Sequence, residues 1–362
     1  MKTSTITAFA LACACACWTI PAAAGNGPLC DTATKFVPDL ACVESARGVA
    51  LAETGERAQY LLGLAEDGAA RFVTHFGHEP LRYAVVEGRD AITPRETIDA
   101  LRKGGFPVVL PWLSDAVFRK QTELSLRRAI TAQMSGQPQE QIDAAVATAL
   151  ARQTDPARRK RIELAAVSHE LGHDWFRVGY WGGGALNEDK HYGGPSPDWL
   201  DEMSAVLMEA PSSFEDRVTQ FRQQFDTYRS DPAKASENIR LLIDLPNFFT
   251  EVHPAAAQVQ LLNEQRSAAE KKEAVRVLTG EEARKIAEGG VRFYLQSAVV
   301  SQYLIDRTGD PKVFDRIAKA FVRGETIEQW LANPEPKGTL PRDLAAIQAD
   351  WLGWLETRFP KS

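Results

Sequence analysis

The chain has 362 residues, of which 44% are hydrophobic and 25% are charged, and its formal net charge is −6. This composition is typical of a globular protein and excludes a disordered or fibrous chain. The negative charge argues against a nucleic-acid partner, which would require a basic surface.

The first 24 residues have the pattern of an export signal. Lys2 supplies a positive charge, residues 6–20 are mostly apolar, and small residues at 21–25 offer a cleavage site. A retained membrane anchor is the alternative, but the apolar stretch is shorter than the ~20 residues that span a bilayer. We therefore expect an exported protein, periplasmic or extracellular, with no stable membrane span after the signal is removed.

Only two of the five cysteines, Cys30 and Cys42, lie beyond the signal segment. The other three lack the leucine three positions earlier that would favour lipid attachment, so that alternative is weak. Two cysteines twelve positions apart in an exported chain predict one disulfide that closes a small N-terminal loop. Two free buried thiols are the alternative. The spacing differs from that of zinc-binding cysteine pairs, so we expect neither cysteine to bind a metal.

The first part of the exported chain is predicted to mix helices and strands. Residues 48–76 have the apolar spacing of a helix that ends at Gly77. Residues 81–87 and 106–110 are predicted strands.

The rest of the chain is predicted to be helical. Residues 115–152 are charged and rich in alanine, with a turn signal at 135–138, which predicts a helical hairpin inserted after the sheet. From residue 214 onward the sequence predicts helices almost throughout. Breaks are expected around 231–232, 245–246 and 333–336.

One predicted helix carries the most informative motif. Asp155-Pro156 marks its start, because Asp is a favoured N-cap and Pro a favoured first helical residue. We expect the helix to continue to about Val178, before a run of glycines ends it. It contains His-Glu-Leu-Gly-His at residues 169–173. Residues four apart on a helix project from the same face, so the imidazoles of His169 and His173 can reach one metal ion.

Apolar residues around this motif predict a helix that is buried nearly all round. The residues expected on the histidine face are Ile162, Ala165, Ala166 and Phe176, and those on the other side are Val167, Leu171, Trp175 and Val178. Two histidines and a carboxylate on a buried helix need compensation, which a metal ion would supply. The alternative is a pair of solvated or hydrogen-bonded histidines beside a surface Glu170.

A catalytic zinc ion usually takes three protein ligands and leaves a fourth position for water. The motif at 169–173 is followed by Trp-Leu-Asp-Glu-x-x-Ala at 199–205. Together these segments resemble the gluzincin zinc metallopeptidases, especially their aminopeptidase branch and the minimal secreted proteins of the peptidase-MA-like group. The resemblance implies that Glu202 is the third ligand and that Ala205 lets two helices approach closely. A metzincin is excluded, because residues 179–189 contain no third histidine at the required spacing.

Asp201 is the competing carboxylate in this segment. On a helix Glu202 shares a face with Ala205, whereas Asp201 lies about 100° away. We expect Asp201 to orient a histidine N–H group or to lie in the solvated first turn of the helix.

The resemblance covers roughly residues 68–356, although only the two motifs above are diagnostic. Residues 293–298 are similar to the helix that supplies a transition-state tyrosine in these enzymes, which implies that role for Tyr294. An ordinary half-buried aromatic residue is the alternative. Residues 350–355 resemble the terminal helix of the family. The exopeptidase motif Gly-Ala-Met-Glu-Asn is absent upstream of His169, which puts aminopeptidase activity in doubt, and the helical insertion has no family counterpart.

We therefore expect a mainly helical α+β, zincin-like fold with a small N-terminal sheet and a helical C-terminal half. The expected divisions are a signal at 1–24, an N-terminal segment with the disulfide at 25–65, a zinc-binding subdomain at 66–210 with the insertion at about 115–152, and a helical subdomain at 211–362.

The expected activity is hydrolysis of a peptide or protein substrate with one bound Zn²⁺. Glu170 would face the open side of the metal and act as general base, and Tyr294 would stabilise the oxyanion. The glycine-rich residues 179–194, with Trp181, His191 and Tyr192, would line the cleft or form an ordinary surface connection.

Two other interpretations stay open. The first alternative is a non-catalytic zinc-binding or scaffold protein that retains the gluzincin fold, although the presence of Glu170 argues against this. A structural zinc site would need a fourth ligand such as His191 or Asp201. The sequence leaves open the oligomeric state, the cleavage specificity, any pro-segment and the choice between endopeptidase and exopeptidase action.

Overall fold

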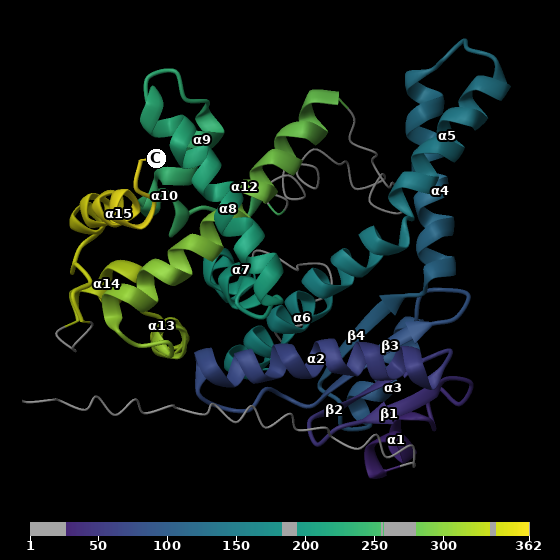
Figure 1. The fold of residues 1–362 in the computed structure, drawn as a ribbon. Helices are drawn as coiled ribbons and strands as arrows, with labels where there is room; N and C mark the ends of the chain where they lie inside the picture. The colour runs from purple at the N-terminus through teal and green to yellow at the C-terminus, as the bar shows by residue number, and fades with distance from the viewer. Residues whose placement is uncertain (1–26, 183–193, 255, 257–279, 334–337, 362) are drawn as a thin grey trace, which may run out of the picture.

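The computed structural model describes residues 27–182, 194–254, 256, 280–333 and 338–361 (Figure 1). The expected signal at residues 1–24 lies outside this part of the chain. Among the described residues, no helix combines the length and the apolar character needed to cross a membrane. Helices make up most of the fold and one small sheet lies near its N-terminus, which confirms a mainly helical α+β class.

The sheet has four strands in the order β1-β2-β3-β4. β1 (Ala41–Glu44) is antiparallel to β2 (Gly48–Ala52), and β3 (Tyr83–Gly88) and β4 (Val108–Leu113) continue the sheet in parallel. Side chains alternate between two cores. One face of the sheet packs on helix α2 (Gly55–Phe76), and the other packs on α1 (Pro28–Ala33) and α3 (Arg95–Lys103). Strands buried on both faces read as continuous apolar runs.

That burial explains an error in the sequence prediction. The helix expected over 48–76 was wrong at its start, because residues 48–52 form β2 and all five are buried. A short apolar run bounded by polar residues cannot be assigned to strand or helix by periodicity alone. The end of the helix is confirmed: α2 stops at Phe76, and Gly77 adopts a left-handed φ of 75°. The boundary expected at 65/66 falls inside α2.

Two further sequence predictions are confirmed. Cys30 and Cys42 form a disulfide that joins α1 to β1. The insertion is a helical hairpin of α4 (Asp115–Gln133) and α5 (Gln139–Gln153), which projects from the rest of the fold (Figure 1).

The motif helix is α6 (Pro156–Trp181), with the Asp155 side chain accepting a hydrogen bond from the Arg158 backbone N–H as its N-cap. It continues three residues beyond the expected end. Its middle, from Val167 to Val178, is buried almost all round, while its first turns are largely exposed. α7 (Asp198–Val206) packs against this buried middle, and α8 (Pro211–Ser230) follows.

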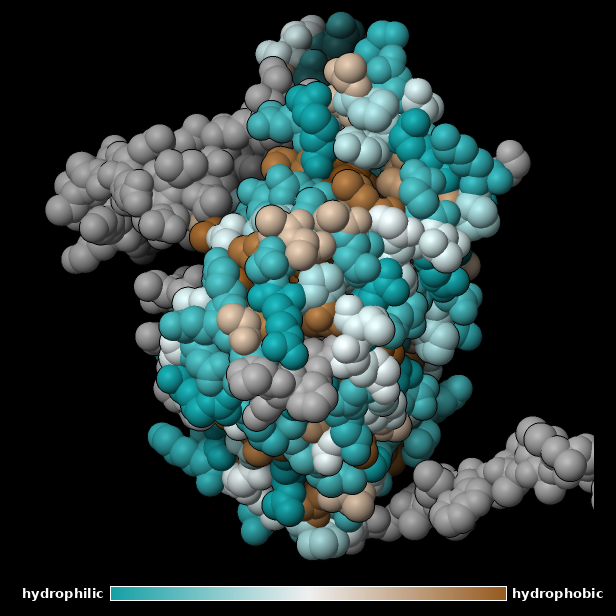
Figure 2. Space-filling model, turned by 90° about the vertical axis from the view of Figure 1, so that its left-hand side faces the viewer, coloured by the Kyte–Doolittle hydropathy of each residue, from teal (hydrophilic) through white to brown (hydrophobic). Residues whose placement is uncertain are grey.

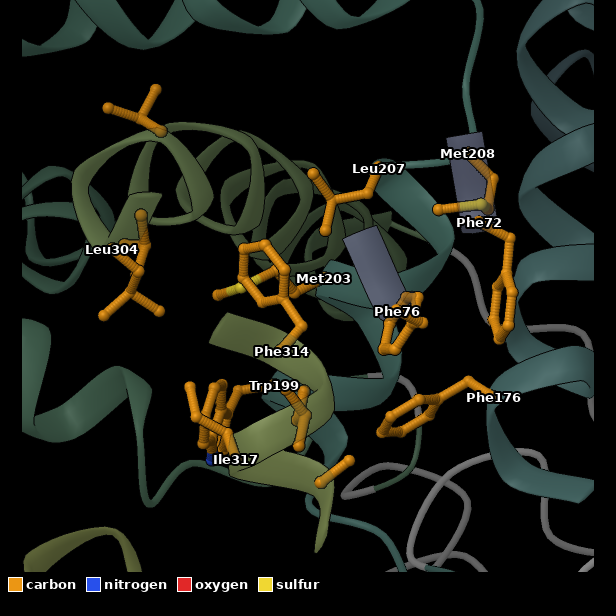
Figure 3. Close-up of a cluster of buried hydrophobic side chains, with 14 of the residues drawn as sticks. Phe72, Phe76, Phe176, Trp199, Met203, Leu207, Met208, Leu304, Phe314 and Ile317 are labelled. Atoms are coloured by element: carbon orange, nitrogen blue, oxygen red, sulfur yellow. The ribbon is translucent and has the colours of Figure 1, made fainter. Parts of the chain in front are cut away.

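The C-terminal half is helical, as expected. Its remaining elements are α9 (Glu237–Ile243), α10 (Leu245–Phe248), α12 (Gly280–Thr308), α13 (Val313–Val322), α14 (Ile327–Ala332) and α15 (Leu344–Arg358). Aromatic and aliphatic side chains from α2, α6, α7 and α13 meet in one core, in which Phe76, Phe176 and Trp199 are labelled in Figure 3. Hydrophilic residues cover most of the face in Figure 2, with apolar residues in small groups between them.

Candidate metal centre

His169 and His173 on α6 and Glu202 on α7 converge at the centre of the fold. The three residues are buried, and Glu202 is fully inaccessible. The Nε2 atoms of the two histidines lie 3.2 Å apart. The Glu202 carboxylate oxygens lie 3.4 Å from Nε2 of His169 and 3.7 Å from Nε2 of His173. One atom from each side chain thus lies within 4.8 Å of the others, which is a group that could hold a metal ion.

The outer nitrogen of each imidazole contacts a second carboxylate. Nδ1 of His173 lies 2.9 Å from Asp201 Oδ1, which is the histidine contact expected for Asp201. Nδ1 of His169 lies 2.8 Å from Glu209 Oε1. A carboxylate accepts a hydrogen bond from Nδ1–H and so fixes the tautomer, which directs the Nε2 lone pair of a neutral imidazole toward the centre.

Glu209 was not identified from the sequence. It follows α7, is fully buried, and accepts a hydrogen bond of 2.7 Å from Nε of Arg217 on α8. Arg71 of α2 donates to the backbone carbonyl of Met208 and so holds the chain just before Glu209. The sequence signal for Glu209 was a single carboxylate in the mostly apolar stretch after Glu202. That signal does not predict the contact with His169, because the contact depends on how the chain turns at the end of α7.

α6 and α7 approach each other closely beside the ligands. A Cβ atom added to Gly172 would lie 2.9 Å from the Ala205 Cα and 3.2 Å from the Ser204 carbonyl oxygen. Real Cβ atoms do not approach backbone so closely without strain. The small residue expected at Ala205 therefore lies at the helix contact, and Gly172 inside the motif is its partner on α6.

The charges around the histidines shift their protonation in opposite directions. Burial alone would lower the pKa of His169, but the carboxylates of Glu202 and Glu209 outweigh it and raise that pKa to about 9. Burial and the neighbouring charge of His169 hold the pKa of His173 well below its usual range.

The candidate catalytic residues lie next to this group. The Tyr294 ring of α12 stands edge-on to His169, with ring centroids 5.7 Å apart, and the Arg217 guanidinium lies 4.9 Å from the Tyr294 ring centre. Tyr294 and Glu170 are both half-buried. His253, which the sequence did not single out, is buried against Tyr294.

Residues 183–193, most of the expected cleft segment at 179–194, lie outside the described part of the chain. His191 and Tyr192 lie outside the described residues. Trp181 is at the end of α6, where its ring packs on Phe176.

Comparison with protein-family models, curated proteins and solved structures gives no match for this chain.

Proposed function

We propose that this chain is an exported, single-zinc peptidase of the gluzincin type. In this proposal His169, His173 and Glu202 bind Zn²⁺, and Glu170 is the general base. The observation that carries the proposal is the convergence of two imidazole nitrogens and one carboxylate next to Glu170. The outer nitrogen of each imidazole contacts a further carboxylate, which orients the ring. The disulfide is compatible with export, because such bonds persist in oxidising compartments.

The separations in this group fit zinc. Tetrahedral ligands at about 2.0–2.1 Å from one zinc ion stand about 3.3 Å apart. The two Nε2 atoms stand 3.2 Å apart, Glu202 Oε1 lies 3.4 Å from His169 Nε2, and the other oxygen, Oε2, lies 3.7 Å from His173 Nε2. Two imidazoles and one carboxylate are also the donor set of catalytic zinc sites that keep a fourth position open.

The charge of the surrounding groups supports a divalent cation. With both imidazoles neutral, Asp201, Glu202 and Glu209 contribute three negative charges, and Arg217 contributes one positive charge. The sum is −2 before the half-buried carboxylate of Glu170 is counted, and a Zn²⁺ ion would offset most of this negative charge. Buried charges are costly unless they are paired or coordinate a metal.

When bound, zinc would supply a Lewis acid that polarises a carbonyl and a water molecule. Glu170 follows His169 by one position and therefore projects from α6 about 100° away from it, beside the face that carries the two histidines. In our proposal it accepts the proton of the attacking water and passes it to the leaving amine. Tyr294 donates a hydrogen bond to the developing oxyanion, and the Arg217 guanidinium against its ring holds the ring in place.

The test combines zinc content with hydrolysis of unfolded casein. We expect about one zinc ion per chain and measurable hydrolysis for the unmodified protein. Glu170→Gln should keep its zinc and lose at least the ~10²-fold that a general base contributes, because glutamine keeps the shape but cannot accept the proton. Glu328→Gln, on the exposed face of α14, is the matched control and should change neither quantity.

The outcomes separate the alternatives. Zinc bound without hydrolysis by the unmodified protein would indicate a non-catalytic zinc-binding or scaffold protein. Full turnover in Glu170→Gln would refute the peptidase mechanism.

A further inference from the structure

A pocket of about 290 Å³ lies between α6 and α8, beside the candidate metal centre. Its size is at the lower end for ligand pockets and suits one side chain rather than a large molecule. The lining residues are Arg161, Leu164, Ala165, Glu209, Ser212, Ser213, Asp216, Arg217 and Gln220. Two of them, Glu209 and Arg217, contact His169 and Tyr294 directly, so the pocket and the metal centre share a wall.

The pocket lining contains two basic and two acidic side chains, so its charges sum to zero. Glu209 and Arg217 form a buried ion pair. Asp216 on α8 and Arg161 on α6 are exposed at the opening. Arg161 is accompanied by Arg158 and Lys160 in the first turns of α6, and we call these three residues the basic rim.

The basic rim faces solvent. Its three side chains are exposed, and within the described part of the chain none of them forms an ion pair. Asp155, the carboxylate at the start of α6, accepts a hydrogen bond from the Arg158 backbone N–H as the N-cap. Arg159, in the same run, is instead buried and pairs with Glu163, so only this one cation of the run has a structural role.

The basic rim is part of a basic region on an acidic protein. Residues 115–163, which comprise the hairpin and the start of α6 up to the partner of Arg159, contain nine Lys and Arg against six Asp and Glu, a net charge of +3. The whole chain has 42 basic and 48 acidic residues, so the remainder carries 33 minus 42, or −9. Such a local reversal of sign attracts an anionic partner to one place on the surface.

The positions of these cations suggest how a polypeptide would lie. Arg158, Arg161, Ala165 and His169 are spaced by three, four and four residues, so they follow one face of α6. At 1.5 Å per residue, Arg161 is about 12 Å and Arg158 about 16 Å from His169 along the helix axis. An extended peptide covers that distance in about four to five residues.

We propose that the basic rim, beside the adjoining pocket, binds an acidic stretch of the polypeptide substrate. This inference rests on the proposed peptidase function and adds a substrate class to it. Acidic residues about three to five positions from the cleaved bond would reach the basic rim while that bond lies at the metal centre. Because Arg161 lines a pocket and shares one face of α6 with Arg158, the surface suits an extended chain better than a flat anionic membrane.

The test is a binding measurement with the Glu170→Gln protein, which cannot hydrolyse the probe under our proposal. Fluorescent 12-residue peptides carry three glutamates three to five positions from the central bond, on either side of it, and matched peptides carry glutamines there. We expect at least one acidic peptide to bind about five- to tenfold more tightly than its glutamine counterpart. The preference should weaken when the salt concentration is raised from about 50 to about 300 mM, because salt shortens the Debye length and screens exposed charges.

Charge reversal identifies the surface. Arg158→Glu combined with Arg161→Glu should abolish the preference, while circular dichroism and zinc content stay unchanged. Arg95→Glu, an exposed reversal on α3, is the control and should keep the preference.

Three results would overturn the inference: equal affinity for acidic and glutamine peptides, a preference that survives the double reversal, or binding to anionic lipid vesicles in place of the acidic peptides. Because binding is measured without turnover, these results are independent of whether the unmodified protein hydrolyses casein.

Discussion

Helix α6 carries two buried polar clusters about 9 Å apart along its axis, and they are built in different ways. The first, which we call the arginine–glutamate cluster, contains Glu163 of α6 with Arg57, Glu87 and Arg159. Arg57 Nη2 lies 2.6 Å from Glu87 Oε1, and Arg159 Nε lies 3.1 Å from Glu163 Oε1. These two positive and two negative side chains cancel one another, and the exposed Asp115 is a further partner of Arg159.

The second cluster is the metal centre, one and a half turns further along α6. Here the atoms that face one another are imidazole nitrogens and carboxylate oxygens. With both imidazoles neutral, Glu202 and the surrounding Asp201, Glu209 and Arg217 sum to −2. Buried charge alone therefore does not indicate a functional site. When the charges of a buried cluster are balanced by ion pairs within it, a structural role is sufficient to explain the cluster. When hydrogen-bond acceptors converge, a proton or a metal ion is required between them.

The largest expected effect distinguishes the ligand from its neighbour. Glu202→Ala should remove a ligand and lower zinc affinity far more than Asp201→Ala, which should lose about 10–100-fold as an outer-shell change. Zinc is measured after dialysis against a mild chelator. If the Asp201 variant loses its zinc while the Glu202 variant keeps it, the ligand assignment and the gluzincin proposal are both wrong.

A change in the arginine–glutamate cluster should affect stability and leave zinc unchanged. Glu163→Ala removes the carboxylate between Arg57 and Arg159, and we expect the free energy of unfolding to fall by about 3 kcal/mol. Denaturant unfolding measures this value. Glu79→Ala, at a surface ion pair with Arg47, is the control and should change it by at most about 1 kcal/mol. A loss of zinc in the Glu163 variant would mean that the two clusters are not separate.

Loss of the contact between Glu209 and His169 should lower zinc affinity, but less than loss of a zinc ligand does. Glu209→Ala should weaken zinc binding by about 10–100-fold, because it frees the outer nitrogen of His169 and leaves Arg217 without its carboxylate. Glu209→Gln keeps an oxygen that can accept from Nδ1–H and should lose less. Equal zinc affinity in the alanine variant and the unmodified protein would assign Glu209 a purely structural role.

The smallest effect is the pH dependence of stability from Glu163. Burial raises the pKa of this carboxyl, but the guanidinium groups of Arg57 and Arg159 outweigh it and hold the pKa below its ordinary value of 4.5. The unfolded chain therefore takes up the proton first as the pH falls. The stabilisation is complete above pH 4.5 and is lost as the pH decreases through the folded pKa. Glu163→Gln should flatten the fall of unfolding free energy as the pH decreases below 4.5; an unchanged slope would contradict this assignment.

The sequence by itself determined the elements whose signals are local. Asp155-Pro156 starts α6 because capping acts within one turn, and Gly77 ends α2 because it adopts a left-handed φ. The helical hairpin and the cysteine pair were likewise predicted from spacing alone. Helix periodicity places His169 and His173 on one face, and the family resemblance drew attention to Glu202.

Only the tertiary structure decided which distant groups meet. Residues 48–52 are a strand because β3 and two helical layers bury them, which local periodicity does not record. Glu209 reaches His169 across forty residues because Arg71 and Arg217, from two other helices, hold the chain after α7. Gly172 matters because Ala205 lies against it. These contacts depend on how helices pack, and packing is fixed by side chains far apart in the sequence.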